Sequence, residues 1–314
     1  MTEGRRYVTV VEVGPRDGLQ NEPGVVPTAA KVAFVEALAA AGLPVVEATA
    51  FVSPRAVPQL ADAAELLGRL SRREGTRYPV LVPNEKGLAR ALAAGAREVA
   101  VFTAASETFN QRNVGASIEE SFARFAPVLA ACRREGIAVR GYVSCGFGCP
   151  YEGGVDPAKT AEVAARLLAA GCFEVSLGDT VGVAVPSEVP EVVGRTVAAG
   201  VPLAALALHF HDTRGTALAN VVEGLREGVR VFDSSAGGLG GCPFAPGATG
   251  NLATEDLLYL LHRSGWETGV DLDGVVAASR AMAALLGRPP ASRVFASVES
   301  SGRAGRVDPS SPRA

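Results

Sequence analysis

Two hydrophobic patterns alternate along the chain: short apolar runs, and longer stretches in which apolar residues recur every three or four positions. The short runs predict buried strands, and the longer stretches predict amphipathic helices. The expected strands are 7–13, 45–51, 78–82, 98–103, 138–144, 173–177, 203–211 and 229–234. The expected helices are 28–41, 58–70, 85–94, 118–135, 157–170, 187–199, 216–227 and 254–264.

This regular alternation implies parallel strands joined by right-handed helical crossovers. Eight such units close into a (β/α)8 TIM barrel, which typically takes about 250 residues. We therefore predict a catalytic barrel over residues 1–290, with 271–287 as a short C-terminal helical extension. The segment 301–314 is rich in Gly, Ser, Pro and Arg, and we expect a disordered tail. An open doubly wound sheet is the alternative, but a glycine-rich dinucleotide loop is missing after the first strand.

Composition narrows the possible partners. The 314 residues are 48% hydrophobic with a net charge of −3, and the charged residues are mixed in sign. This charge pattern gives no electrostatic reason to expect binding to nucleic acid or to a membrane surface. The first residues carry no apolar signal segment, and no apolar run approaches the roughly 18 residues of a membrane span. We therefore expect a cytoplasmic protein, whose five scattered cysteines are reduced thiols. Exposed barrel helices often form dimers, so we expect a homodimer.

A pair of histidines closes the seventh expected strand. His209 and His211 are two of only three histidines in the chain, and one residue separates them. Because side chains alternate along a strand, both should point to the same face. Two imidazoles on one face can hold one metal ion. A pair of hydrogen-bonded core histidines is the alternative that this pattern alone leaves open.

Other polar residues follow the remaining strands, where barrels place their chemistry. Asp17 and Asn251 could add oxygen ligands to the two histidines, and this mixed set suits Mg²⁺ or Mn²⁺, with zinc as an alternative. Arg16 could steady negative charge on an oxygen. Cys242 lies in a glycine-rich stretch that could close over the site, and a thiol there is a candidate acid or base. Each has a structural alternative, such as an inert buried thiol.

Several segments resemble those of the hydroxymethylglutaryl-CoA lyases, in register from about the first strand to the eighth helix. They are 11–22 (VEVGPRDGLQNE), 47–54 (EATAFVSP), 141–145 (GYVSC) with 148–153 (GCPYEG), 177–180 (LGDT), and 238–243 (GLGGCP) with 250–256 (GNLATED). The arginine–aspartate opening is shared with the wider group of metal-dependent carbon–carbon lyases and Claisen-type synthases. The glycine-rich loop that carries Cys242 is the more specific mark of the lyases.

The resemblance implies metal-dependent cleavage of 3-hydroxy-3-methylglutaryl-CoA to acetoacetate and acetyl-CoA, a step of leucine degradation. It implies four metal ligands: Asp17, His209, His211 and Asn251. It implies catalytic roles for Cys242, Arg16, Asp179 and Glu47, and substrate contacts from Arg16, Gln20 and Ser144. The residues themselves leave the general base open between Asp179, Glu47 and a water linked to a histidine. Asp179 could instead cap the next helix, and Glu47 could simply pair with an arginine.

Two positions depart from the common family pattern: Phe210 between the histidines, and Arg214 shortly after them. Phe210 should point away from the metal, whereas Arg214 could touch the acyl chain or the CoA phosphates. A lyase for a related 3-hydroxyacyl-CoA therefore remains an alternative. A Claisen-type synthase, a metal-dependent hydrolase and a non-catalytic binding barrel are further alternatives. Synthases of this group usually carry extra C-terminal domains, and hydrolases commonly place their H-x-H pair on the first strand.

Overall fold

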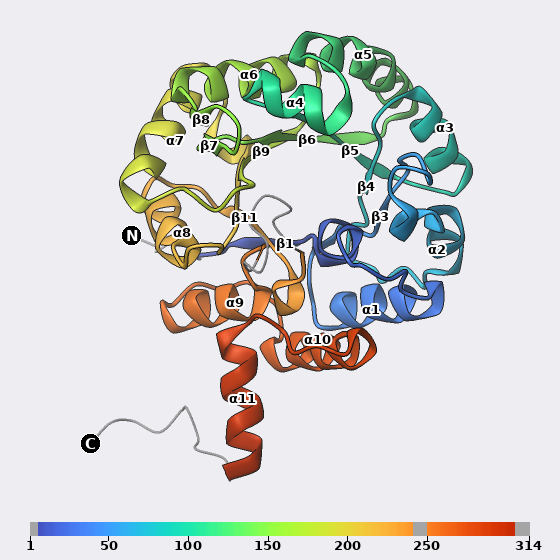
Figure 1. Ribbon diagram of the computed structural model, residues 1–314, viewed down its shortest axis with the longest axis vertical. Coiled ribbons are helices and arrows are strands. Elements are labelled where there is room, and N and C mark those ends of the chain that lie inside the picture. Colours follow the sequence, from blue (N-terminus) through green and yellow to red (C-terminus); the bar gives the residue numbers. More distant parts are fainter. Residues whose placement is uncertain (1–5, 241–249, 305–314) are drawn as a thin grey trace.

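The computed structural model describes residues 6–240 and 250–304. Its centre is a curled parallel sheet with the strand order β2-β1-β11-β10-β9-β6-β5-β4-β3. These strands are β1 (Thr9–Glu12), β2 (Val45–Val46), β3 (Thr49–Ala50), β4 (Val80–Leu81), β5 (Glu98–Ala104), β6 (Ala138–Ser144), β9 (Glu174–Asp179), β10 (Leu206–Phe210) and β11 (Val231–Ser234). Figure 1 shows them inside a ring of helices. The predicted α/β class with parallel strands is confirmed.

Helices cover the outer side of this sheet. They are α1 (Thr28–Ala40), α2 (Ala63–Arg69), α3 (Glu85–Ala93), α5 (Ile118–Glu135), α6 (Pro157–Ala170), α7 (Val189–Ala198), α8 (Ala217–Arg226) and α9 (Thr254–Arg263), followed by α10 (Leu272–Leu286) and α11 (Arg293–Ala304). The sequence did not reveal α4 (Glu107–Val114) or the small hairpin of β7 (Gly148–Cys149) and β8 (Gly153–Gly154). Among the described helices, none has the length and apolar character to cross a membrane.

The second predicted strand, 45–51, is divided into β2 and β3, so the sheet has nine strands where we predicted eight. Successive N–H groups of this segment donate alternately to its two sides, as in a parallel strand with a neighbour on each side. The backbone N–H of Glu47 donates to the carbonyl of Glu12 on β1 (2.8 Å), whereas that of Ala48 donates to Pro79, next to β4 (3.0 Å). β2 pairs with β1 and β3 pairs with β4, so the two stand at opposite ends of the strand order, although only two residues separate them in the chain.

Local signals explain which boundaries could be predicted. α5 has the predicted bounds because Ser117 and Glu120 form a capping box and Gly136 ends the helix in the left-handed region. The predicted helix 58–70 is instead a 3₁₀ turn, Pro58–Leu60, followed by α2. β10 starts at Leu206, later than predicted, since residues Leu203–Ala205 form a 3₁₀ turn. α11 runs to Ala304, four residues into the segment predicted to be a disordered tail.

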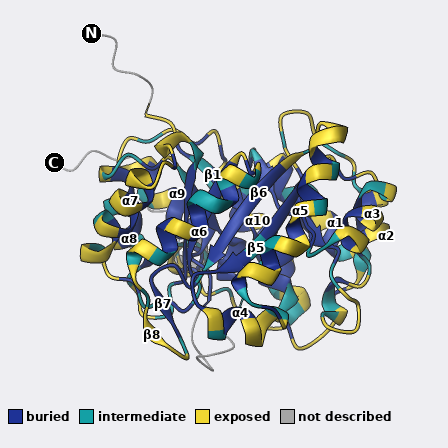
Figure 2. Ribbon diagram, turned by 90° about the horizontal axis from the view of Figure 1, so that it is seen from above, coloured by how far each residue is buried: buried dark blue, intermediate teal, exposed yellow. Residues whose placement is uncertain are grey.

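The two faces of the sheet differ in polarity. Leu208, Phe210 and Phe232 are buried in the hydrophobic core between the strands and the helices. The alternate positions, such as Tyr142, Ser176 and His209, line a cavity inside the curl of the sheet. In Figure 2 the strands are buried, whereas the outward surfaces of the helices are exposed. This alternation places an apolar core between the strands and the helices and a polar cavity inside the curled sheet, where buried charges need partners.

Glu12 illustrates that need. This fully buried carboxylate accepts hydrogen bonds from the N–H groups of Gly14 (2.8 Å) and Ala236 (2.9 Å) and from the hydroxyl of Thr254 (2.7 Å). It thereby ties β1 to the segment after β11 and to the start of α9. Burial raises the pKa of Glu12 to about 7, and the nearby carboxylate of Glu255 acts in the same direction.

We expect the substitution Glu12→Gln to change how stability depends on pH. The pKa of Glu12 is higher in the folded chain than in the unfolded chain. Between about pH 4.5 and 7 the unfolded chain therefore binds fewer protons than the folded chain. The contribution of Glu12 to stability consequently falls as pH rises through this window. The wild type should therefore lose stability relative to the variant, by up to about 3 kcal/mol. Urea unfolding from pH 5 to pH 8 measures this difference, with the exposed Glu85→Gln as the control. Equal pH dependence in all three proteins would contradict it.

Candidate metal centre and active site

Three side chains from distant parts of the chain meet at one end of the curled sheet. One ligand atom each from Asp17, His209 and His211 lies within 4.8 Å of the other two. His209 lies on β10 and His211 directly follows it, and their rings are 5.2 Å apart. Asp17 lies in a π-helical turn, Gly14–Gly18, in which the N–H groups of Arg16, Asp17 and Gly18 donate to the carbonyl of Val13. The predicted same-face arrangement of the histidines is therefore present, and Asp17 lies beside it.

Asn251 completes this group through its backbone and its side chain. It forms an antiparallel bridge with His211, and its amide nitrogen donates to Asp17 Oδ2 (2.8 Å) and to the carbonyl of Leu239 (3.1 Å). Asn251 Oδ1 and His211 Nδ1 are buried, and neither has a hydrogen-bond partner among the described residues. Buried polar atoms without a partner are costly, and a cation would satisfy both lone pairs. The donor set therefore fits a divalent ion.

The charges also suit metal binding. Burial alone would raise the pKa of Asp17, but Arg16 and the two histidines hold it below its ordinary value. Burial, and after it the neighbouring His209, lower the pKa of His211 to about 3. At neutral pH, Asp17 is therefore a carboxylate and His211 is a neutral imidazole, which are the forms that bind a cation.

Arg16 lies beside this cluster and is held on both sides. Its Nε donates to Glu47 Oε2 and its Nη1 to Asp17 Oδ1, each at 2.7 Å. The guanidinium also lies 5.5 Å from the ring centre of Tyr142. Burial raises the pKa of Glu47, although the charge of Arg16 opposes this effect. Glu47 thus pairs with an arginine, the structural role that the sequence left open, and it fixes the position of Arg16.

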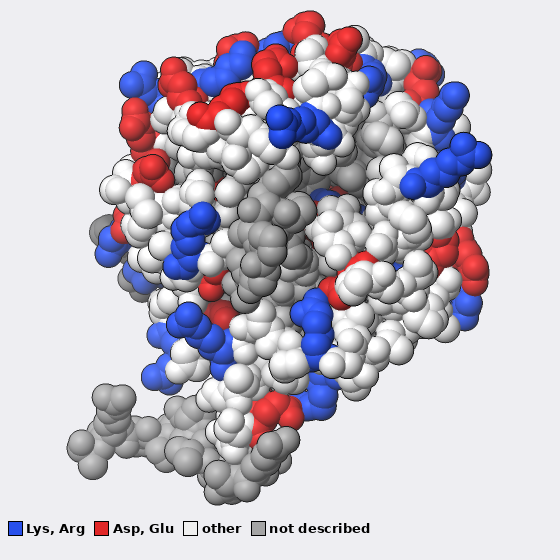
Figure 3. Space-filling view, viewed as in Figure 1, with Lys and Arg blue, Asp and Glu red and all other residues white. Residues whose placement is uncertain are grey.

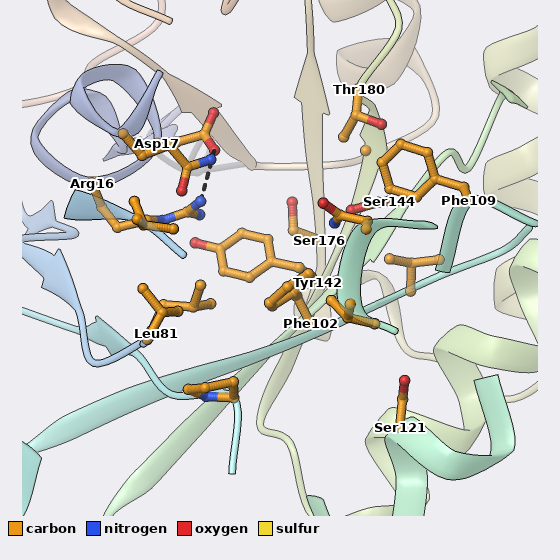
Figure 4. Close-up of a pocket in the computed structure, with 18 of the residues that line it drawn as sticks. Arg16, Asp17, Leu81, Phe102, Phe109, Ser121, Tyr142, Ser144, Ser176 and Thr180 are labelled. Carbon is orange, nitrogen blue, oxygen red and sulfur yellow. Dashed lines mark hydrogen bonds and ion pairs between the residues drawn. The ribbon is translucent and has the colours of Figure 1, made fainter. Parts of the chain in front are cut away.

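A cavity of about 560 Å³ opens beside the cluster and reaches to α4 and α5. Its wall includes Arg16, Asp17, His209 and His211, together with the predicted substrate contacts Gln20 and Ser144. In Figure 4 the hydroxyl of Tyr142 points towards Arg16, and Phe109 and Ser121 lie on the opposite side of the cavity. The space-filling view in Figure 3 shows a hollow at the centre of this face, with acidic and basic side chains interspersed around it. A cavity of this volume could take a ligand larger than a small acid.

Asp179 is not brought into this cavity. Its carboxylate accepts hydrogen bonds from the N–H groups of Val183 (3.0 Å) and Ala184 (2.9 Å), and it is not among the lining residues. Burial raises its pKa, and these backbone donors oppose the rise. Both carboxylate oxygens thus bind the turn that follows β9, and the catalytic role that we expected stays a prediction.

The two positions that depart from the family pattern also lie outside the cavity lining. Phe210 points away from the metal cluster, as expected, and its ring lies 5.6 Å from that of Phe147. Arg214 donates to the carbonyls of Val181 (3.1 Å) and Gly182 (2.8 Å). Arg214 therefore braces a turn rather than lining the cavity wall.

Cys242 lies outside the described residues, so its predicted role is untested. The described residues on either side of its segment meet at the cluster, since Asn251 bonds to the carbonyl of Leu239. Cys132, Cys145, Cys149 and Cys172 are buried free thiols, in agreement with the expected reduced state.

Sequence reasoning missed the residues behind the metal cluster. Asp233 and Arg140 are almost fully buried and form a bidentate ion pair, with Nη2 2.8 Å from Oδ1 and Nη1 3.2 Å from Oδ2. Tyr142, which lies two residues after Arg140 on β6, stood out in the sequence only as part of the segment GYVSC. The available signal was a charged residue inside each of two otherwise apolar strands, since buried charges need partners.

A parallel α/β sheet with a mixed oxygen and nitrogen cluster at its strand ends is an arrangement of metal-dependent enzymes. The HMGL-like family model matches residues 7–282. The chain belongs to this family.

Named relatives agree with this assignment. The hydroxymethylglutaryl-CoA lyase, mitochondrial, of Rattus norvegicus is 55% identical over 289 residues, which cover 92% of this chain and 89% of the relative. The 3-hydroxy-3-methylglutaryl-CoA lyase, cytoplasmic, of the same species is 55% identical and covers 87% of this chain and 79% of its own. The crystal structure of hydroxymethylglutaryl-CoA lyase from Pseudomonas aeruginosa is 50% identical, with a TM-score of 0.92, and covers 94% of this chain and 98% of its own.

We expect the substitution His211→Ala to abolish tight binding of Mn²⁺, because it removes a nitrogen donor at the centre of the cluster. Titration of metal-free protein with Mn²⁺, followed by electron paramagnetic resonance of the free ion, measures this loss. The matched control is His262→Ala, since His262 bonds to Thr268 away from the cluster. Binding of wild-type strength by the His211 variant would show that the histidine pair is structural.

Proposed function

We propose that the protein is a hydroxymethylglutaryl-CoA lyase, which cleaves 3-hydroxy-3-methylglutaryl-CoA to acetoacetate and acetyl-CoA with Mg²⁺ or Mn²⁺. The observation that carries the proposal is the metal cluster of Asp17, His209 and His211, which lies at the wall of the cavity. Arg16 and Asn251 lie beside this cluster. The names of relatives that are 55% identical to this chain over the aligned residues support the same reaction.

The four proposed metal ligands are Asp17, His209, His211 and Asn251. Their donor set is that of a site for a hard or intermediate divalent ion, with positions left for water and substrate. Such an ion, when bound, would lower the pKa of the tertiary hydroxyl group of the substrate. The cavity beside it offers Gln20 and Ser144 as substrate contacts.

Arg16 is proposed to stabilise the negative oxygen that forms as the carbon–carbon bond breaks. Its guanidinium is preorganised by Glu47 and Asp17, so it needs no rearrangement as charge develops. Neither Glu47 nor Asp179 lines the cavity, so of the three candidates for the general base we favour a water beside the histidines. Cys242 is proposed to protonate the enolate carbon of the leaving acetyl-CoA.

We also infer the finer points of architecture and setting. β2 and β3 together act as one strand that closes the sheet as an eight-stranded barrel, a proposal supported by their hydrogen bonds to both neighbours. The proposed setting is a cytoplasmic homodimer in leucine degradation. The relatives bear both mitochondrial and cytoplasmic names. A lyase for a related 3-hydroxyacyl-CoA is the second candidate.

The direct test is a coupled assay for acetyl-CoA release from 3-hydroxy-3-methylglutaryl-CoA, with chelator-treated protein and added Mg²⁺ or Mn²⁺. We expect turnover that depends on the metal, because the ion would activate the hydroxyl group. Heat-treated protein and chelated protein are the controls. Absence of release by protein that binds Mn²⁺ would contradict this substrate and direct attention to other 3-hydroxyacyl-CoA thioesters and to the synthase reaction.

Substitution of Cys242 by alanine tests the proposed acid. We expect turnover to fall by about two or more orders of magnitude, the usual scale for a lost acid or base, while Mn²⁺ binding stays close to wild type. The control is Cys132→Ala, since Cys132 is buried in the hydrophobic core. Unchanged turnover in the Cys242 variant would remove the role assigned to this thiol.

A further inference from the structure

Behind the metal cluster lies a carboxylate that the proposed reaction does not use. Asp233 on β11 is 1% exposed, and its side chain is fully buried. The strand register places it directly beside His209, since the two residues are Cα partners in the pairing of β10 with β11. Asp233 Oδ2 lies 3.4 Å from His209 Nδ1. The neighbouring strands thus bring a negative charge to the side of His209 that carries Nδ1.

This contact assigns different tasks to the two nitrogens of His209. An ionised carboxylate can only accept hydrogen bonds, so it favours the tautomer of His209 that carries its hydrogen on the nearby Nδ1. The lone pair is then on Nε2, the nitrogen that remains for the proposed metal. His211 lacks such a partner, since its Nδ1 is buried without a hydrogen bond among the described residues. The two histidines of the cluster are therefore not equivalent.

The position of Asp233 is itself fixed by three donors. Arg140 binds both carboxylate oxygens, at 2.8 and 3.2 Å, and the hydroxyl of Ser176 donates to Oδ2 at 2.8 Å. Arg140 is held on its other side by Glu174, whose Oε1 accepts from Nε at 2.6 Å. Since Arg140 is 1% exposed and bound at both ends, the carboxylate of Asp233 has little freedom to turn away from His209.

We infer that Asp233, anchored by Arg140, is a positioning residue that holds His209 in its Nδ1-protonated form with Nε2 directed to the metal. The inference rests on the metal centre of the proposed function. The hydrogen bond that a metal-bound histidine donates to a carboxylate fixes its tautomer and its ring orientation, and loss of such a bond typically costs about 10- to 100-fold in metal affinity.

The first measurement uses wild-type protein without metal. Long-range ¹H–¹⁵N correlation spectra of protein labelled at histidine report the tautomer of each ring, and the chain has only three histidines. The variants His211→Ala and His262→Ala assign the signals. We expect the Nδ1–H tautomer for His209. The Nε2–H tautomer would overturn the inference, whether or not the protein proves to bind a metal or to cleave an acyl-CoA.

The second measurement is a Mn²⁺ titration of Asp233→Asn beside Glu174→Gln. Both variants remove one negative charge from the partners of Arg140, but only the first changes the group that faces His209. We expect the Kd for Mn²⁺ to rise by about 10- to 100-fold in Asp233→Asn and to stay close to wild type in Glu174→Gln. Equal loss in both variants, or none in Asp233→Asn, would overturn the positioning role.

The two measurements separate this inference from the proposed function. Wild-type protein that binds no Mn²⁺ would remove the metal centre, and the tautomer of His209 would still decide whether Asp233 orients the ring. If Asp233→Asn fails to fold, as judged by circular dichroism, the wild-type spectra decide the same point. An Nδ1–H tautomer together with a selective loss of affinity in Asp233→Asn supports the inference in full.

Discussion

The requirement that buried charges have partners governs the interior of this protein. Two arginines, Arg16 and Arg140, lie inside the curled sheet and are 8% and 1% exposed. An unpaired ion in such a place costs several kcal/mol even after the protein relaxes. Each guanidinium is therefore bound by two carboxylates: Glu47 and Asp17 for Arg16, and Glu174 and Asp233 for Arg140. Asp17 is itself a member of the metal cluster, and Asp233 contacts its member His209. The ion pairs that neutralise the two arginines therefore also hold the proposed metal ligands in place.

Tyr142 lies where the two charged networks meet. The guanidinium of Arg140 lies 4.8 Å from the centre of its ring, and that of Arg16 lies 5.5 Å away. Both cations lie within about 6 Å of one aromatic ring and are attracted by its negative faces. The phenol oxygen is buried and has no hydrogen-bond partner among the described residues, although it belongs to the cavity lining. A polar group with these properties is best satisfied by a molecule bound in the cavity.

The sequence was sufficient wherever the signal is local. α5 could be predicted to the residue because its first and last turns carry their own caps in Ser117 and Gly136. The same-face arrangement of His209 and His211 follows from strand alternation alone. The division of 45–50 into β2 and β3 could not be predicted, because every residue of this run is buried and nothing in its pattern marks an interruption. α4 was missed because its sequence, ETFNQRNV, lacks a continuous apolar stripe.

The candidate site shows the same limit. Asp17, the histidines and Asn251 could be named from motifs, and the structure brings them together. Asp233 could be recognised from the sequence only as a charge in need of a partner. Its contact with His209 depends on the register of β10 with β11. Its pairing with Arg140, 93 residues away in the chain, depends on the curl that brings β6 across from β11. Asp179 differs from Asp233, since its contacts are with the turn that follows it, and its catalytic role stays a prediction.

The C-terminal extension gains a physical role from its contacts. The N–H of Gly237 donates to Glu255 (2.9 Å), and its carbonyl accepts from the N–H of Ala291, between α10 and α11. Gly237 and Gly238 have φ values of 69° and 63°, which a residue with a Cβ rarely adopts, so this turn needs both glycines. The start of the glycine-rich segment is thus bound by α9 and by the extension, and its end, Asn251, is bound by Asp17. A shift of the first anchor would therefore reach the proposed metal ligand Asn251, because its side chain also bonds to the carbonyl of Leu239.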